Sequence, residues 1–471
     1  MNLLLIAPCR SARRGHTRRY GKGFFRVPPL GLMNVAAVTP PEWETFIIDE
    51  NIQDLPSHIT PDLVGISVMT ASATRAYEIA DAYRIRGIPV VLGGAHASVL
   101  PEEALLHANA VVTGEAETIW GVLLDDFKRG GQKALKRIYC SKNFPDMEIV
   151  PIPSADTLNL QCTYVIDNLL NITRGCPHNC SFCSVTRLLG KKIRHRPVEA
   201  VIDHIKKGLA GKKKPTLRDR FYVFVDDNIM ADRVYAKELF RALIPLNILW
   251  ISQASINSAY DDEMLELAAQ SGCVGVFIGL ESISQDSLDE IKKTQNHPNF
   301  YRDGVKRFQK KGIFVEGAFI FGFDHDGPEV FRKTADFACR LGLDGVQYTI
   351  LTPLPGTDFY ETIETTARFT ESNWAQYDTL HLVFKHPSMN TEDMEAGLHY
   401  AYKRTYSLRG ILTRTLQALA DRRWKFFFML LAFNLGYRRN LHYMWKSARD
   451  PSRIGKGYPD GNIREQKERS A

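Results

Sequence analysis

Three cysteines stand close together in the segment RGCPHNCSFCSVTR, at positions Cys176, Cys180 and Cys183. Their C-x3-C-x2-C spacing crowds three thiolates onto one short loop, and soft sulfur ligands suit iron–sulfur clusters and zinc. No fourth cysteine is nearby, since Cys162 lies 14 residues before Cys176 and the next one after the loop is Cys273. A metal site that lacks one protein ligand is typical of catalysis, because a substrate can bind the metal there. The segment therefore predicts a catalytic metal centre.

A structural zinc ion, held by the three cysteines and by His178 or His195, is the alternative. Structural zinc sites are closed and seldom lie at the mouth of a barrel, which favours the catalytic centre. Eight cysteines in 471 residues are too few for a secreted scaffold that depends on disulfides. The cysteines outside the cluster are expected to be buried or free thiols: Cys9, Cys140, Cys162, Cys273 and Cys339.

The cysteine loop needs a scaffold, and residues 166–375 predict one. Helical sequence separates most of six strand candidates: DNLLNITRG, RFYVFVDD, LWISQAS, GVFIGLE, FVEGAFIFG and DGVQYTILT. Repeated βα units predict a partial (β/α)6 barrel of the TIM type, with its site at the carboxyl ends of the strands. The cysteine loop follows the first of these strands, so it lies at the predicted site.

Residues 1–130 predict a separate α/β domain. Five apolar strand candidates alternate with helical sequence: NLLLIAP, TFIIDE, LVGISV, PVVLGG and AVVTGE. Such a pattern is typical of a doubly wound parallel sheet that is covered on both faces. An open α/β sheet binds its ligand at the carboxyl ends of its strands, where this chain has Ser67, Thr70, Gly93, Gly94, Gly114 and Glu115.

The rest of the chain differs from these two series. Residues 131–165 include NFPDMEIVPIPSADTL, with three prolines, and predict an extended linker. From residue 376 the strand pattern stops, and 376–471 predict a helical, basic region. Residues 401–471 hold 16 Lys and Arg against 5 Asp and Glu, from totals of 60 and 53. A local basic surface is therefore expected, and a nucleic-acid groove through the whole protein is not.

The cysteine segment resembles the radical S-adenosylmethionine (SAM) enzymes, in which a C-x3-C-x-aromatic-C loop holds a [4Fe–4S] cluster whose open iron binds SAM. Phe182 occupies the aromatic position. The resemblance implies further SAM contacts at strand ends, namely Asp226, Asp227, Asn228, Gly279, Glu281, Ser282, Gly317 and Gly322. Plainer roles are the alternatives: Asp226 and Asp227 would cap the next helix, Gly279 would be a packing glycine, and Glu281 would be a solvated acid.

The N-terminal domain resembles the cobalamin-binding domain that precedes the radical domain in one branch of this superfamily. PPLGL, DLVGISVMT, VVLGGAHAS and VVTGEAET carry the resemblance, which implies cobalamin contacts at the six strand-end positions and at His96. The Asp-x-His-x-x-Gly motif of better-known cobalamin proteins is absent, so the cobalt ligand stays open, with His16 as another polar candidate. A cofactor-free α/β domain is the alternative. Only Cys9 precedes residue 140, which excludes the methylthiotransferases and their three N-terminal cysteines.

The segment DRRWKFFFMLLAFNLGYRRNLHYMWKS, which begins at Asp421, has an apolar centre between basic flanks. This pattern suits a helix that lies in a membrane interface, and a core helix packed on the barrel is the alternative. No stretch approaches the ~18 apolar residues of a spanning helix. The first residues show no secretory pattern. A cytoplasmic protein is expected, with peripheral contact to the inner face of the membrane through its C-terminal region.

Together these features resemble a cobalamin-dependent radical SAM C-methyltransferase, which implies a [4Fe–4S] cluster, SAM and cobalamin as cofactors. In that family, reductive cleavage of SAM leads to hydrogen abstraction from an unactivated carbon, and cobalamin supplies the methyl group. A small-molecule or lipid substrate and an external electron donor are expected, since enzymes that methylate hopanoids have a similar basic tail. The alternatives are cyclisation or ring rearrangement with the same cofactors, and a zinc-stabilised binding protein.

Overall fold

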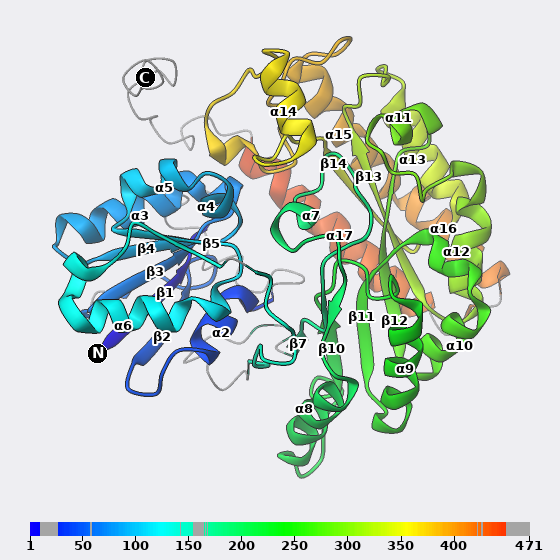
Figure 1. Ribbon diagram of the computed structural model, residues 1–471. Coiled ribbons are helices and arrows are strands. Elements are labelled where there is room, and N and C mark those ends of the chain that lie inside the picture. Colours follow the sequence, from blue (N-terminus) through cyan, green and yellow to red (C-terminus); the bar gives the residue numbers. More distant parts are fainter. Residues whose placement is uncertain are drawn as a thin grey trace.

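Two α/β domains lie side by side in the computed structural model, with a group of helices at the C-terminal end of the chain (Figure 1). His16, Cys162, Arg422 and Lys425 lie outside the described residues. The structure describes residues 1–9, 27–56, 59–141, 143–153, 164, 166, 168–421, 423–424 and 427–448, with only the backbone for 440 and 442–448.

A parallel sheet of six strands forms the N-terminal domain, in the order β2-β1-β3-β4-β5-β6. The first five strands are the predicted ones. The sixth lies within 131–165, the segment that the sequence predicted as a linker. The strands are β1 (Asn2–Ala7), β2 (Glu44–Asp49), β3 (Leu63–Ser67), β4 (Val90–Gly93), β5 (Ala110–Thr113) and β6 (Ile138–Cys140).

Helices cover both faces of this sheet. One face packs on α3 (Ala73–Ile85), α4 (Ala95–Val99) and α5 (Pro101–His107), and the other on α2 (Leu30–Ala37) and α6 (Trp120–Gly130). Strand residues alternate between the two cores, so the strands read as continuous apolar runs. The predicted doubly wound parallel sheet is confirmed.

The short strand β6 forms because of one aromatic side chain. Tyr139 is buried in the core on the α6 side. Its hydroxyl donates to Asp126 of α6 at 2.9 Å. Burial of a large ring with its hydroxyl bonded stabilises a strand that is too short to show a periodic pattern.

A second parallel sheet of six strands forms the next domain, in the order β14-β13-β12-β11-β10-β7. Each strand overlaps one of the six predicted segments, and the sheet does not close, which confirms the partial barrel. The first segment is split, since the chain leaves the sheet after two residues. The strands are β7 (Leu169–Leu170), β10 (Phe221–Phe224), β11 (Leu249–Ala254), β12 (Cys273–Glu281), β13 (Phe314–Phe321) and β14 (Gly345–Ile350).

Helices cover the outer face of this sheet (Figure 1). Along β12, Val276, Ile278 and Leu280 are buried against them, whereas Phe277 and Gly279 face the inner side. Side-chain caps start several of the helices, for example at Asp232 and Asp261. The helices are α8 (Val198–Ala210), α9 (Arg233–Leu243), α10 (Asp262–Gln270), α11 (Gln285–Glu290), α12 (Tyr301–Lys310), α13 (Val330–Leu341) and α14 (Asp358–Thr365).

The free edge of β14 is covered by α15 (Thr391–Thr405), the first of three C-terminal helices. An open edge would leave N–H and C=O groups unpaired. The Tyr402 hydroxyl accepts from Tyr348 N at 3.0 Å and donates to Tyr348 O at 2.7 Å. The hydroxyl of Tyr406, just after α15, accepts from Val346 N at 2.9 Å and donates to Val346 O at 2.7 Å. Two tyrosines therefore take the place of a further strand.

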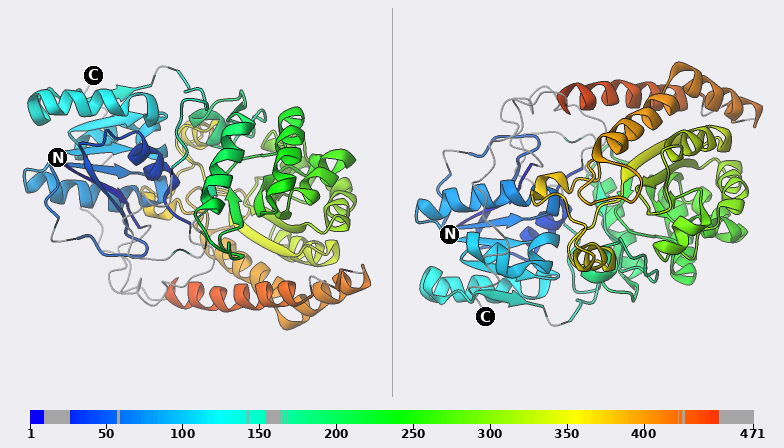
Figure 2. Two further views of the ribbon diagram at one scale, coloured as in Figure 1. Left: turned by 90° about the horizontal axis from the view of Figure 1, so that it is seen from below. Right: turned by 90° about the horizontal axis from the view of Figure 1, so that it is seen from above.

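The helices α16 (Leu408–Ala420) and α17 (Phe427–Ala448) form an outer layer along one side of the molecule (Figure 2). The ring of Phe433 in α17 meets Phe314 of β13, with centroids 5.0 Å apart. Arg423 precedes α17 and binds the buried Asp344 carboxylate at 2.8 and 2.9 Å. This face of α17 packs as a core helix. Within the described part of the chain, no helix is both long and apolar enough to cross a bilayer.

Candidate functional site

The three clustered cysteines lie on the loop between β8 (Thr173–Arg174) and the short helix α7 (Val185–Leu188), and all three thiols are free and half-buried. The strand β8 pairs antiparallel with β9 (Arg194–His195), outside the main sheet. The loop begins at a residue that must be glycine. Gly175 has a φ of +95°, and a Cβ there would lie 2.4 Å from the Lys192 carbonyl oxygen.

The stem of the loop is held by Asp226, at the end of β10. Its fully buried carboxylate accepts hydrogen bonds from the Thr173 backbone N–H and, at 2.7 Å, from Thr173 Oγ1. Burial raises the pKa of Asp226 to about 7, whereas the hydrogen bonds from Thr173 favour its charged form. Asp226 therefore positions the cysteine loop from the end of β10. The sequence suggested a SAM contact or a helix cap for this residue and did not predict this role.

The next two residues lie at the same strand end. Burial raises the pKa of half-buried Asp227 to about 6. Burial also raises the pKa of Cys176, and the charges of Cys180 and Asp227 add to that rise. Asn228 donates from Nδ2 to Ser255 Oγ at 2.6 Å. Asn228 Oδ1 is buried without a donor among the described residues. A buried acceptor with no donor fits a ligand that carries ammonium or hydroxyl groups, as SAM does.

Lys293 and Glu281 form a buried ion pair beside the cysteines, with Nζ and Oε1 2.6 Å apart. Burial favours the neutral amine, but the charges of Glu281 and Cys180 raise the pKa of Lys293. A charged amine near the sulfurs stabilises thiolates, the form that binds iron. Gln295 Nε2 lies 3.8 Å from Cys180 Sγ, and its Oε1 is a second buried acceptor without a donor in the described part of the chain. Sequence reasoning missed Lys293 and Gln295, because KKTQN is a loop without a periodic pattern.

The shape of the segment 279–282 depends on this ion pair. Glu281 has a φ of +63°, which is uncommon for a residue with a side chain. Its carboxylate folds back over Gly279, where a Cβ would lie 2.2 Å from Glu281 Oε1. Asn296 Nδ2 donates to the carbonyls of Gly279 and Leu280, at 2.8 and 3.1 Å. The alternative of a solvated acid is wrong for Glu281, which is buried.

The remaining residues with a predicted SAM contact lie near the same end of the barrel or in its core. Phe182 is half-buried against the barrel core, and Ser282 is buried just after β12. Gly322 has a φ of +104° at the end of β13. Gly317 faces the helices, since a Cβ there would lie 2.7 Å from the Leu343 side chain. The structure gives Gly317 a packing role.

The zinc alternative needs an imidazole beside the cysteines. His195 instead stacks on Tyr235 of α9, with ring centroids 4.1 Å apart. Among the residues that the structure describes, no three His, Cys, Asp or Glu side chains are grouped as ligands of a single ion. Sulfur ligands of one zinc lie about 4 Å apart, whereas each sulfur around a cubane binds a different iron and lies further from its neighbours.

The smaller of two cavities, about 270 Å³, lies at the carboxyl edge of the N-terminal sheet. Gly94 has a φ of +93°, and a Cβ there would lie 2.8 Å from Val68 N, so only glycine fits. Small residues let a flat or elongated group approach the backbone closely. Among the lining residues are five with a predicted cobalamin contact: Ser67, Gly93, Gly94, Gly114 and Glu115.

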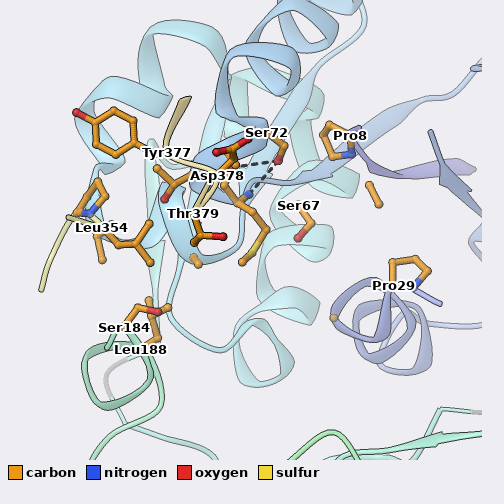
Figure 3. A pocket seen from close by; sticks show the side chains of 18 of the residues that line it. Pro8, Pro29, Ser67, Ser72, Ser184, Leu188, Leu354, Tyr377, Asp378 and Thr379 are labelled. Atoms are coloured by element: carbon orange, nitrogen blue, oxygen red, sulfur yellow. Dashed lines mark hydrogen bonds between the residues drawn. The ribbon is translucent and has the colours of Figure 1, made fainter. Parts of the chain in front are cut away.

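The larger cavity, about 410 Å³, lies between the two domains (Figure 3). Ser67 and Thr70 line it from the first domain, and Leu188 lines it from α7, which continues the cysteine loop. The segment after α14, in the C-terminal part of the chain, adds a polar wall of Tyr377, Asp378 and Thr379. One chamber is therefore bounded by the edge of the N-terminal sheet and by the cysteine loop.

His96, a predicted cobalamin contact, lines neither cavity. Its ring is fully buried, with Nδ1 3.3 Å from Thr70 Oγ1 and Nε2 3.3 Å from Glu103 Oε1. Trp374 contacts the ring edge-on and donates to Glu103 at 2.8 Å. No histidine is among the described residues that line the two cavities. His96 connects the N-terminal domain to the segment after the barrel.

Glu115 lines the smaller cavity and also connects the two domains. It forms buried ion pairs with Arg194, at 2.5 Å, and with Arg174. Glu117 binds the same Arg174 at 2.6 Å. Arg174 directly precedes the cysteine loop, so these contacts fix the loop relative to the N-terminal sheet. The sequence did not predict this network, because its members are 57 or more residues apart.

Comparison with known proteins agrees with this geometry. Residues 170–338 match the radical SAM superfamily, and residues 21–123 match the B12 binding domain. Bacteriochlorophyllide d C-12(1)-methyltransferase from Chlorobaculum tepidum is 32% identical over 393 residues, which cover 82% of this chain and 84% of that protein. The chain belongs to the cobalamin-binding radical SAM enzymes. The predicted family and enzyme class are thereby confirmed.

Two further relatives of this radical SAM enzyme extend the comparison. Hopanoid C-2 methylase from Rhodopseudomonas palustris is 25% identical over 74% of this chain and 66% of that protein. The fold is shared with the radical SAM methyltransferase TsrM from Kitasatospora setae, whose structure holds cobalamin and a [4Fe–4S] cluster. Its TM-score is 0.59 at 17% identity, over 87% of this chain and 86% of that one. The predicted cofactors, a [4Fe–4S] cluster, SAM and cobalamin, are confirmed.

The role of Asp226 in holding the loop can be tested by substitution. Asp226→Ala leaves the buried Thr173 N–H without an acceptor, so we expect the free energy of unfolding to fall by about 2–4 kcal/mol. We also expect less iron to bind after anaerobic reconstitution. Asp226→Asn keeps an acceptor at Oδ1, so its loss of stability should be less than half of that in Asp226→Ala. Denaturant unfolding and iron counts measure both effects.

The matched control for this test is Asp262→Ala, which removes an exposed acid of α10. It should leave stability and iron content unchanged. Full iron content in Asp226→Ala would show that the loop does not depend on this carboxylate.

Proposed function

We propose that this enzyme is a cobalamin-dependent radical SAM C-methyltransferase that acts on an unactivated carbon of a hydrophobic substrate, such as a lipid. One observation carries the proposal: the cavity of about 410 Å³ is bounded both by the edge of the cobalamin domain, at Ser67 and Thr70, and by α7 after the cysteine loop, at Leu188. A substrate there would lie within reach of both cofactors, as methyl transfer to a carbon radical requires.

In this proposal Cys176, Cys180 and Cys183 hold the cluster. Burial raises the pKa of Cys176 and Cys183, and the positive charge of Lys293 opposes that rise. The unpaired acceptor of Asn228 and the turn at 279–282 bind SAM, together with Phe182, Asp227 and Gly322. The bound cluster and SAM supply the radical chemistry, and cobalamin supplies the methyl group. The protein contributes binding, orientation and exclusion of water.

Cobalamin is assigned to the edge of the N-terminal sheet. The smaller cavity, whose walls include Gly93, Gly94 and Gly114, suits an elongated tail that must approach the backbone. Ser67 lines both cavities, so they meet at that residue. A corrinoid with its tail in the smaller cavity would present its ring to the larger one. Glu115, bound to two arginines, closes the smaller cavity on the side of the barrel.

The proposed hydrophobic substrate follows from the walls of the larger cavity. Most of its lining residues are apolar, among them Pro8, Leu30, Met69, Val99 and Leu354. A mostly apolar chamber with some polar groups binds a largely apolar ligand and orients it by a few hydrogen bonds. The external electron donor, the cytoplasmic location and the membrane contact expected from the sequence stay predictions.

Blocking the smaller cavity tests the cobalamin site. A Cβ on Gly93 makes only ordinary contacts, with Val112 O nearest at 3.6 Å, so Gly93→Leu should fold with its side chain in the cavity. Overfilling costs about 1–3 kcal/mol, which lowers cobalamin affinity roughly 5- to 150-fold. Absorbance titration with hydroxocobalamin measures the affinity.

Iron content should stay at the wild-type level in Gly93→Leu, because the cysteine loop is untouched. The control is Gly121→Leu, at an open position of α6 that lines neither cavity. If Gly93→Leu bound cobalamin with wild-type affinity, the smaller cavity would not be the cobalamin site.

Labelled SAM tests the reaction itself. The anaerobically reconstituted enzyme is given cobalamin, a reductant, SAM with a deuterated methyl group, and a lipid extract of cells that make the protein. We expect 5′-deoxyadenosine to form and mass spectrometry to show a product that carries the labelled methyl group. Cys180→Ala, which lacks one cluster ligand, should give neither. 5′-Deoxyadenosine together with an unlabelled, altered product would identify cyclisation or rearrangement and contradict methyl transfer.

A further inference from the structure

An exposed apolar stripe runs along α16. Leu408, Leu412, Leu416 and Leu419 share one face of this helix, at spacings of four, four and three residues, and are between 38% and 65% exposed. Phe428, at the start of α17, is 79% exposed. Surface helices normally present polar side chains on such a face. A contiguous apolar stripe on a folded protein marks an interaction surface.

The neighbouring face of α16 packs against the rest of the protein. Ile411, Thr415 and Ala418 are buried, and Arg414 donates to the Leu343 carbonyl oxygen. The helix is therefore fixed on the barrel, and the leucines are not turned outward by loose packing. They line neither of the two cavities.

The charges around the stripe have one sign. Residues 408–448 contain eight Lys and Arg, of which Arg414 and Arg423 are buried, and a single acid, Asp421, whose carboxylate is paired with Lys306. Arg409 is exposed on α16 next to Leu408, and Arg438 and Arg439 are exposed on α17. Apolar side chains flanked by basic ones match a membrane with anionic lipids, which attracts each cation and accepts the leucines.

We propose that α16 and the start of α17 bind the surface of an anionic membrane, with the leucine stripe inserted at the level of the headgroups. A second copy of this chain fits the stripe less well, because it would bring two basic surfaces together. The sequence had pointed to the apolar centre after Asp421, but within it Leu430 is buried and Phe433 packs on β13. The surface proposed here lies mainly on α16, with Phe428 from the start of α17, and does not depend on the nature of the substrate.

Cosedimentation of the full-length enzyme with vesicles tests the proposal. Wild-type protein should bind vesicles of phosphatidylglycerol and phosphatidylcholine, and bind pure phosphatidylcholine at least tenfold more weakly. The triple variant Leu408→Gln, Leu412→Gln and Leu416→Gln should lose at least tenfold in affinity for the anionic vesicles. Arg409→Glu should weaken binding to anionic vesicles and leave binding to neutral ones unchanged.

The control carries the same change at exposed positions elsewhere: Ile85→Gln with Val234→Gln, at side chains that are 86% and 80% exposed on α3 and α9. It should bind like wild type. Iron and cobalamin contents and the melting temperature show whether each variant is folded.

Three results would overturn the proposal: no binding of the wild type to anionic vesicles, equal binding by the folded triple variant, or binding that the control variant also loses. Light scattering adds a fourth, since a dimer that the triple variant abolishes, without vesicle binding by the wild type, would assign the stripe to a second copy. None of these results bears on methyl transfer, which the labelled-SAM experiment tests separately.

Discussion

Two consecutive residues tie the cysteine loop to both domains, and the site depends on them. Thr173 binds Asp226, the buried carboxylate at the end of β10, and Arg174 binds Glu115 at the edge of the N-terminal sheet. The loop begins with the next residue, Gly175, so its position is set from two sides at once. Buried charges are costly unless their geometry is good and their hydrogen bonds are complete. Such contacts tolerate one arrangement of the domains and disfavour the others.

The arrangement of the cavities follows from that junction. Ser67 lines both the glycine-walled cavity within the N-terminal domain and the larger chamber between the domains. The smaller cavity is shaped by backbone, because Gly94 admits no Cβ. The larger one is shaped by side chains from three parts of the chain, including Leu188 and Tyr377. A family that keeps its cofactors and varies its substrates can change the second set of walls and leave the first alone.

Local patterns predicted the scaffold, and long-range pairs escaped prediction. Apolar runs between helices revealed eleven of the twelve strands in the two six-stranded sheets, because buried parallel strands are continuous in sequence. The strand at Tyr139 was missed, since three residues carry no period. The cysteine spacing is local, so it was visible. The partners Lys293 and Arg174 were not, because Lys293 lies in a loop without a periodic pattern and Arg174 pairs with acids 57 or more residues away.

The helices α16 and α17 show why a high content of apolar residues does not by itself identify the helix that binds a membrane. The centre of α17 is the more apolar segment, and basic residues flank it, as in a membrane-surface helix. One of those flanking residues, Arg423, instead forms an ion pair with the buried Asp344, and Phe433 packs on β13. A core helix that is anchored by a buried arginine has the same sequence pattern as an interfacial one. In α16 the apolar positions are fewer and well spaced, and because its other face already packs on the barrel, the remaining leucines face outward.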